Sequence, residues 1–85
     1  MSMISNAIAF SDYRVLVELN NGNAIILDFE KKLNTFRFHK LDNNNIFMKV
    51  KTDGFSLLWD NGKIRVSLGE IIEMLQDTKS LFKVV

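Results

Sequence analysis

Asn-Gly and Asp-Gly pairs between short apolar runs constrain this chain more than any other feature of its sequence. They occur at Asn21-Gly22, Asp53-Gly54 and Asn61-Gly62. Both residues of such a pair tolerate the positive φ angles that tight hairpin turns require. Runs rich in Val, Ile and Leu flank the pairs, as expected for strands that pair through these turns. The sequence therefore predicts a fold built from antiparallel β-hairpins.

Side-chain parity predicts the register of the last two hairpins. Successive side chains of a strand point to opposite faces, so a slip of one residue turns a strand inside out. Two-residue turns at Asp53-Gly54 and Asn61-Gly62 place apolar residues of three strands on one buried face. The expected pairs are Thr52 with Phe55, Val50 with Leu57, Met48 with Trp59, Trp59 with Ile64, Leu57 with Val66, and Phe55 with Leu68.

The first half of the chain requires a different loop length. A two-residue loop at Asn21-Gly22 would bring Asp28 onto the face of Val15. A three-residue loop over 20–22 avoids this and puts Gly22 at a left-handed position that glycine suits. We therefore expect the longer loop there and a two-residue turn at Ser11-Asp12. The resulting pairs are Val17 with Ile25, Val15 with Leu27, Phe10 with Tyr13, and Ile8 with Val15.

Two helices are expected, one after each set of strands. Asp28 is a candidate N-cap for the first, which has Phe29, Leu33 and Phe36 at helical spacing. Asn34-Thr35 interrupts that segment, because the apolar residues beyond it are in a different phase. The second helix begins at the capping box Ser67-Leu68-Gly69-Glu70. Its expected apolar stripe is Leu68, Ile71, Ile72 and Leu75.

The fold class follows from this order of elements. We expect one α+β domain over residues 1–85, with about six antiparallel strands and two helices in the order β-β-β-α-β-β-β-α. Tyr13–Leu33 and Phe55–Leu75 each hold a strand, a turn, a strand, a cap and a helix. This is either an internal repeat or the ordinary recurrence of such hairpins. Residues 81–85 fit a late strand, a helix extension or a partner-binding segment.

Few residue types in this chain suit catalysis or metal binding. Cysteine is absent, and the one histidine, His39, lies in the basic segment Arg37–Lys40. Asp42-Asn43-Asn44-Asn45 lacks the glycine and distal glutamate of a calcium loop, so we expect a polar turn. Neither metal-ligand spacing nor a glycine-rich phosphate loop occurs. We therefore expect no catalytic residue, no metal, no cofactor and no enzymatic activity.

The sequence also favours a cytoplasmic protein. Residues 1–4 are not a basic region that leads into a long apolar run, as a signal peptide would be. No stretch approaches the ~18 apolar residues that a membrane span needs. Small secreted domains usually carry disulfides, which this cysteine-free chain cannot form.

One charged surface follows from the predicted register. The parity that buries Trp59 directs four cations outward around Ser56 and Leu58, namely Lys49, Lys51, Lys63 and Arg65. Such a face either binds phosphates or an acidic partner, or is solvated and partly balanced by Asp60 opposite Lys63. A second basic region contains Lys31, Lys32, Arg37 and Lys40. Parity places the aromatic residues Trp59, Phe55 and Phe36 in the core.

A pattern of turn and apolar residues runs over residues 4–75. It comprises Tyr13, Val17, Asn21-Gly22, Asp28, Phe38-x-x-Leu41, Phe47-x-x-Val50, Gly54 and Trp59-x-Asn61-Gly62. This pattern resembles a family of small prokaryotic proteins, domain of unknown function 2442. It departs at Asp60, where members often have proline, and at residues 76–85, which extend past the usual end. The resemblance implies an α+β fold and no assigned activity. Some members are fused to helix-turn-helix domains, and others are encoded beside a second small protein in a toxin–antitoxin-like arrangement.

These observations support a non-enzymatic regulatory or interaction module that binds another protein or a second copy of itself. The first alternative is a nucleic-acid-binding domain that uses Lys49, Lys51, Lys63 and Arg65. The net charge of +1 gives no general basic field, so this binding would depend on the local patch. The second alternative is a small-molecule sensor with a pocket between sheet and helices.

Overall fold

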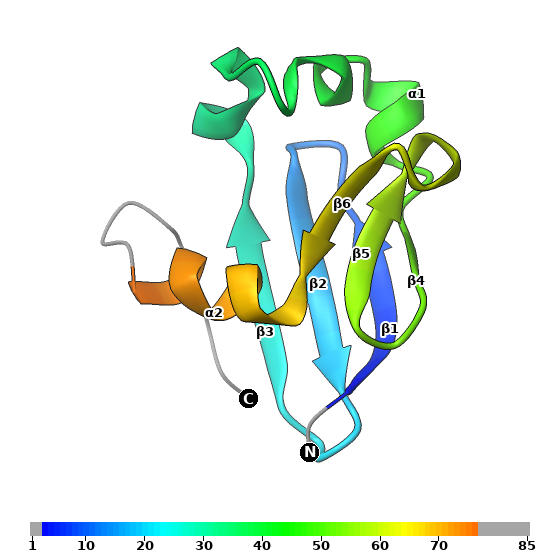
Figure 1. The fold of residues 1–85 in the computed structure, drawn as a ribbon, viewed down its shortest axis with the longest axis vertical. Coiled ribbons are helices and arrows are strands. Elements are labelled where there is room, and N and C mark those ends of the chain that lie inside the picture. The colour runs from blue at the N-terminus through cyan, green and yellow to red at the C-terminus, as the bar shows by residue number, and fades with distance from the viewer. Residues whose placement is uncertain (1–2, 77–85) are drawn as a thin grey trace.

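The computed structural model describes residues 3–76 and contains two three-stranded antiparallel sheets (Figure 1). The first sheet consists of β1 (Ile4–Ala9), β2 (Arg14–Leu19) and β3 (Ala24–Asp28). The second consists of β4 (Lys51–Thr52), β5 (Ser56–Trp59) and β6 (Ile64–Ser67). The helices are α1 (Asn44–Phe47), between the sheets in the sequence, and α2 (Leu68–Gln76), after β6. The predicted α+β class is confirmed.

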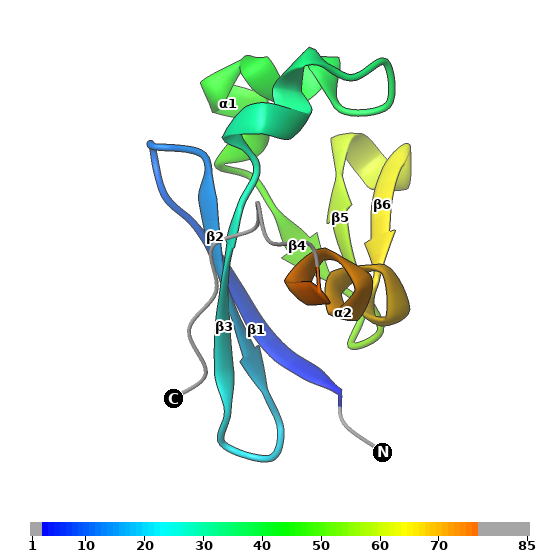
Figure 2. The ribbon, with the colours of Figure 1, turned by 90° about the vertical axis from the view of Figure 1, so that its left-hand side faces the viewer.

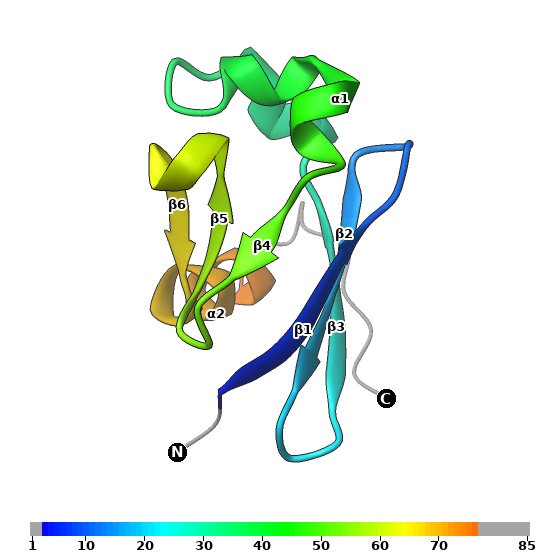
Figure 3. The same cartoon turned by 90° about the vertical axis from the view of Figure 1, so that its right-hand side faces the viewer.

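The two sheets enclose one shared interior. On one side β1 lies beside β4, and the Ile4 amide donates to the Gly54 carbonyl at 2.8 Å (Figure 3). On the other side α2 occupies the space between β3 and β6 (Figure 2). The segment from β3 to β4, which includes α1, covers one end. Within residues 3–76 no helix is long and apolar enough to cross a membrane.

An aromatic cluster fills the interior between the sheets. The Trp59 ring centroid lies 5.4 Å from that of Phe29 and 5.9 Å from that of Phe47. All three side chains are buried. The indole Nε1 donates to the Phe47 carbonyl at 2.9 Å. Without this hydrogen bond, burial of the tryptophan would leave its one polar atom without a partner. The core prediction for Trp59 is confirmed.

The predicted three-residue loop between β2 and β3 is confirmed. Val17 pairs with Ile25, and Val15 pairs with Leu27. Gly22 has a φ of 89°, the left-handed conformation that glycine adopts without a steric penalty. All four paired side chains are buried, so this register places the apolar side chains in the core.

The predicted turn at Ser11-Asp12 is wrong by one residue. Ala9 pairs with Val15, and Ile8 pairs with Leu16, so β1 has the opposite parity to the one expected. The loop has three residues because Tyr13 adopts a φ of 67°. Its hydroxyl donates to the Asp42 carbonyl at 2.6 Å, and its ring packs edge-on against Phe47. Tertiary contacts therefore hold a conformation that the residue type disfavours. Two large apolar side chains become exposed as a result, Ile8 and Phe10.

The register predicted at Asp53-Gly54 is also wrong. Thr52 pairs with Leu57 rather than with Phe55, so the expected pairings of Val50 and Met48 fail as well. The Asp53 carboxylate accepts hydrogen bonds from the amides of Phe55 and Ser56, both at 2.9 Å, which lengthens the loop. Phe55 is 51% exposed and is not a core residue.

The last hairpin has the predicted register. Trp59 pairs with Ile64, and Leu57 pairs with Val66. The Leu68 amide donates to the Phe55 carbonyl at 2.8 Å, which continues the same register to the end of the sheet. Asp60, Asn61 and Gly62 form a short 3₁₀ turn, and all three have positive φ angles.

The first predicted helix is replaced by two 3₁₀ turns, Glu30–Asn34 and His39–Asp42. The Asp28 carboxylate accepts from the Glu30 amide at 2.9 Å, as a cap would. The predicted interruption is confirmed, because Thr35 is extended. Phe36 is 91% exposed, so its predicted place in the core is wrong. The break at Thr35 removes the helical phase that would have turned its ring inward.

The predicted polar turn over 42–45 is only partly correct, because Asn44–Phe47 forms α1. The Asn43 side chain accepts from the Asn45 amide at 3.0 Å and caps this helix. Phe47 anchors the helix in the core. Met48 is the C-cap residue of α1 and lies outside β4, so it does not form the predicted strand pair with Trp59, and its side chain is 44% exposed.

The second helix begins as predicted. The Ser67 hydroxyl accepts from the Glu70 amide at 3.2 Å, and the Glu70 carboxylate accepts from the Ser67 amide at 3.3 Å. Ile71 and Met74 are buried, whereas Ile72 is 49% exposed, so the predicted stripe is wrong at Ile72. The expectations for residues 81–85 fall outside the described residues.

Candidate functional site

Three of the four predicted cations line one hollow on the outer face of the second sheet. Lys51 lies on β4, Arg65 lies on β6, and Lys49 follows α1. Lys63 is exposed in the turn before β6 and does not line the hollow. The predicted patch is therefore narrower than parity alone indicated, because Lys63 belongs to a turn and not to the paired part of the strand.

The hollow is bounded by α1, the outer face of the sheet and the turn before β6. Its volume is about 550 Å³. We call it the basic groove and define it by its lining residues, Ile46, Lys49, Lys51, Leu58, Trp59, Asp60, Asn61, Gly62 and Arg65. Lys51 pairs with Leu58, and Leu58 pairs with Arg65, so the three residues form one row across the sheet. An aliphatic side chain thus stands between two cations.

The floor of the basic groove is aliphatic. Leu58 and Ile46 are both partly buried and contribute apolar surface. Trp59 also lines the groove but is only 1% exposed, and its Nε1 is bonded to the Phe47 carbonyl. The indole therefore supports the floor from below and offers little ring surface for stacking.

The lysines carry the unbalanced charge of the groove. Arg65 Nη1 lies 3.8 Å from the Asp53 carboxylate. The pKa of Asp53 is lowered, mainly because its carboxylate accepts a hydrogen bond from the Phe55 amide, then because it accepts one from the Ser56 amide, and to a smaller extent because Arg65 is near. Within residues 3–76, neither Lys49 nor Lys51 has a carboxylate within 4.0 Å. Anionic groups would therefore be attracted most strongly to the lysine side of the groove.

Asp60 is balanced by a cation other than the predicted one. Its carboxylate lies 3.4 Å from Lys40 Nζ, so it pairs with the second basic region and not with Lys63. The loop that carries Lys40 folds over this end of the second sheet, which local sequence could not indicate. Only one side chain of the groove lining, Asp60, is anionic.

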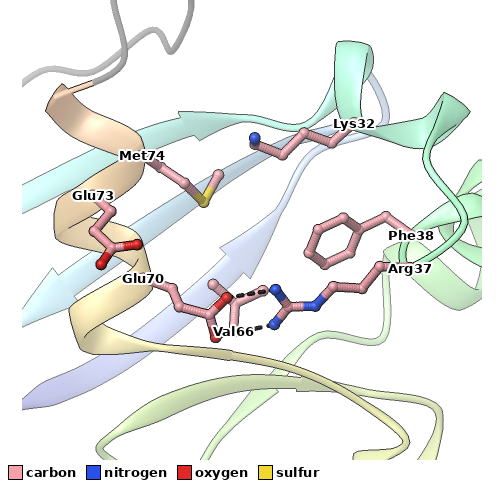
Figure 4. A pocket seen from close by; sticks show the side chains of 7 residues that line it. All are labelled: Lys32, Arg37, Phe38, Val66, Glu70, Glu73 and Met74. Carbon is pink, nitrogen blue, oxygen red and sulfur yellow. Dashed lines mark hydrogen bonds and ion pairs between the residues drawn. The ribbon is translucent and has the colours of Figure 1, made fainter.

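A second hollow, of about 260 Å³, lies between α2 and the loop after β3 (Figure 4). Arg37 forms two hydrogen bonds with the Glu70 carboxylate, one of them at 3.0 Å, and a third with the Arg65 carbonyl. The Arg37 hydrogen bond is the main reason that the pKa of Glu70 is lowered, and the same bond raises the pKa of Arg37. This pair covers the outer edge of β6 and neutralises part of the second basic region.

The one histidine of the chain, His39, makes a local contact and does not belong to a metal-binding cluster of the described residues. The exposed His39 ring donates from Nδ1 to the Phe36 carbonyl at 2.7 Å, which is a local structural contact. Between residues 3 and 76 no three histidine, aspartate or glutamate side chains gather in a way that could hold a metal ion.

Comparison with family models, with curated proteins and with solved structures finds no match to this chain. The resemblance to domain of unknown function 2442 therefore stays a prediction. The basic groove and its geometry carry the functional argument.

Proposed function

We propose that the protein is a non-enzymatic interaction module whose basic groove binds an acidic segment of another protein. The observation that carries the proposal is the row Lys51–Leu58–Arg65 across three strands. Adjacent strands lie about 4.8 Å apart, so the two cations stand about 10 Å apart with an apolar side chain between them. An extended segment with carboxylates at positions i and i+4 and an aliphatic residue at i+2 presents all three side chains on one face, and so matches this row in charge and in order.

A protein partner suits the groove better than nucleic acid does. Proteins that bind single strands combine a strongly positive channel with exposed aromatic rings on which bases stack. The lining has aliphatic surface at Ile46 and Leu58, while the Trp59 ring is buried. The net charge of the chain is only +1, which gives weak attraction to a phosphate backbone.

The proposed setting is regulatory. The resemblance of residues 4–75 to domain of unknown function 2442 supports a module that works with a second small protein or with a DNA-binding partner. Either partner could supply the acidic segment. This chain would then contribute recognition, and its partner would contribute the toxin, antitoxin or transcription-regulating activity.

The test is fluorescence anisotropy with a labelled peptide that contains Glu-Ser-Leu-Ser-Glu, in which alternate residues share one face, compared with its Gln-Ser-Leu-Ser-Gln analogue. We expect the acidic peptide to bind and the amide analogue to bind at least about tenfold more weakly. Lys51→Glu should weaken binding by about tenfold or more, because it places a carboxylate beside Leu58. Lys63→Glu makes the same change of charge outside the groove and is the matched control.

Two further measurements distinguish the alternatives. A single-stranded oligonucleotide that binds more tightly than the peptide, with a steep loss between about 50 and 200 mM salt, would favour the nucleic-acid function. A thermal-shift screen against metabolites tests the small-molecule sensor. Equal effects of Lys51→Glu and Lys63→Glu on peptide binding would contradict a role for the groove.

A further inference from the structure

The first sheet has a row of apolar side chains on the face that points away from the shared interior. Ile8 pairs with Leu16, and Leu16 pairs with Ile26. These side chains point opposite to the buried Val15 and Val17. Ile8 is 41% exposed, and Leu16 and Ile26 are partly buried. We call these three residues the outer apolar row.

The sequence of this sheet is typical of strands that are covered on both faces. An antiparallel sheet with one solvated face usually alternates apolar and polar residues. β2 instead has the run Val15–Val17, and β3 has the run Ala24–Leu27, without a polar residue in either. The second sheet follows the usual rule, because Lys51 and Arg65 point outward there. The first sheet therefore has more apolar surface on its outer face than solvation favours.

Two opposite charges flank the outer apolar row at equal distances on β2. Arg14 lies two residues before Leu16, and Glu18 lies two residues after it, on the same face. Both are held only by exposed contacts. Arg14 lies 3.5 Å from Asp12, and Glu18 accepts a hydrogen bond from Asn6 at 3.0 Å. The pattern is thus a cation, an apolar residue and an anion along the central strand.

We propose that this face binds the same face of a second copy of the chain. The two-fold axis lies in the plane between the two sheets, passes over Leu16 and runs at right angles to β2. That axis lays β2 antiparallel on β2 of the second copy and places Arg14 over the other copy's Glu18, twice. An axis parallel to β2 would instead place Arg14 over the other copy's Arg14, which like-charge repulsion disfavours. The pattern is self-complementary, as an isologous interface requires, and aligned packing of two sheets is a standard arrangement.

The interface is small, so the dimer is weak. Three strands of five or six residues offer less area than a standard stable interface. We expect a dissociation constant on the order of 10–100 μM. This surface lies on a different sheet from the basic groove, so self-association and peptide binding are separable.

The test is sedimentation equilibrium of the full chain from about 10 μM to about 1 mM, with charge variants on β2. Arg14→Glu and Glu18→Arg should each raise the dissociation constant about tenfold or more, because each faces like charges twice in the dimer. The double variant recreates opposite charges across the two-fold axis, so its dissociation constant should lie within about threefold of that of the original protein. An unrecovered double variant would overturn the proposed axis.

A second pair of variants tests the outer apolar row. Leu16→Lys should abolish the dimer, whereas Ile72→Lys, an apolar-to-cation change at an exposed position of α2, should leave it intact. Circular dichroism confirms that each variant is folded. A monomer at every concentration would overturn the proposal.

Discussion

Tyr13 sets the course of the N-terminal hairpin through a backbone conformation that tyrosine rarely adopts. Its φ of 67° matches the left-handed position that Gly22 holds in the next loop. Equivalent backbone hydrogen bonds close the two loops. The Phe10 amide donates to the Arg14 carbonyl, and the Leu19 amide donates to the Asn23 carbonyl, both at 2.8 Å. A non-glycine residue at such a position costs on the order of 1 kcal/mol, which the contacts of the tyrosine ring and hydroxyl offset.

Tyr13→Phe tests this account. The change keeps the ring against Phe47 but removes the hydroxyl hydrogen bond to the Asp42 carbonyl. We expect the free energy of unfolding to fall by about 1 kcal/mol, which is the usual net value of one such bond. Urea denaturation followed by circular dichroism measures it. A variant as stable as the original protein would show that ring packing alone holds the conformation.

The contrast between Gly22 and Tyr13 explains which turns could be predicted from the sequence. Gly22 adopts a left-handed conformation for a local reason, the absence of a Cβ, so the loop before β3 was predicted correctly. Tyr13 does so for a tertiary reason, its contacts with Asp42 and Phe47, which lie about thirty residues away. No local pattern contains that information, so the predicted β1–β2 register differs from the observed one by one residue.

At the scale of elements, the Arg37–Glu70 pair joins the start of α2 to the edge of β6. Glu70 completes the capping box with Ser67, and Arg37 also binds the Arg65 carbonyl on that edge. Carbonyl and amide groups on a strand edge invite pairing with other chains, so covering them protects the sheet. One ion pair therefore supports the helix terminus and satisfies backbone groups of the strand.

Glu70→Gln should make stability less dependent on pH. The pKa of Glu70 is lowered in the folded protein, so the unfolded chain binds its proton more readily. Its stabilising contribution is therefore present above the unfolded pKa and is lost as the pH falls from about 5 towards 3. Glutamine keeps the capping oxygen but not the charge. Water screens this partly exposed pair, so we expect a loss of about 0.5–1 kcal/mol at pH 7 and almost none at pH 3.

Glu73→Gln provides the matched control. Glu73 is exposed on the same helix and forms no ion pair within the described part of the chain. Chemical denaturation of both variants and of the original protein across this pH range isolates the contribution of Glu70. An equal pH response in the two variants would contradict the role given to the Arg37–Glu70 pair.

The basic groove could be predicted from the sequence only in part. Parity on β4 to β6 correctly directs Lys51 and Arg65 to the outer face. The wall formed by α1 was missed, because the asparagine run before it resembles a turn. Asn43 as an N-cap ahead of Ile46 and Phe47 is the local signal that could have indicated a short helix. The Lys40–Asp60 pair depends on tertiary folding and has no local signal.

At the scale of the whole molecule, the two sheets depend on one core. Trp59 on β5 packs against Phe29, which follows β3, and against Phe47 of α1. Each half has a three-stranded sheet, but a 3₁₀ turn follows the first and an α-helix follows the second. Whether the halves arose by duplication stays a prediction. Neither could bury its apolar face without the other, because their inner faces cover each other.

We therefore expect the described fold to unfold in one cooperative step. Trp59 is the only tryptophan, so its fluorescence reports on the second sheet, while far-ultraviolet circular dichroism reports on the whole backbone. The two urea transitions should coincide. Val17→Ala, in the fully buried centre of the first sheet, should shift both midpoints equally and cost about 2–3 kcal/mol. If the halves were independent, the fluorescence transition would stay in place while only part of the dichroism signal moved.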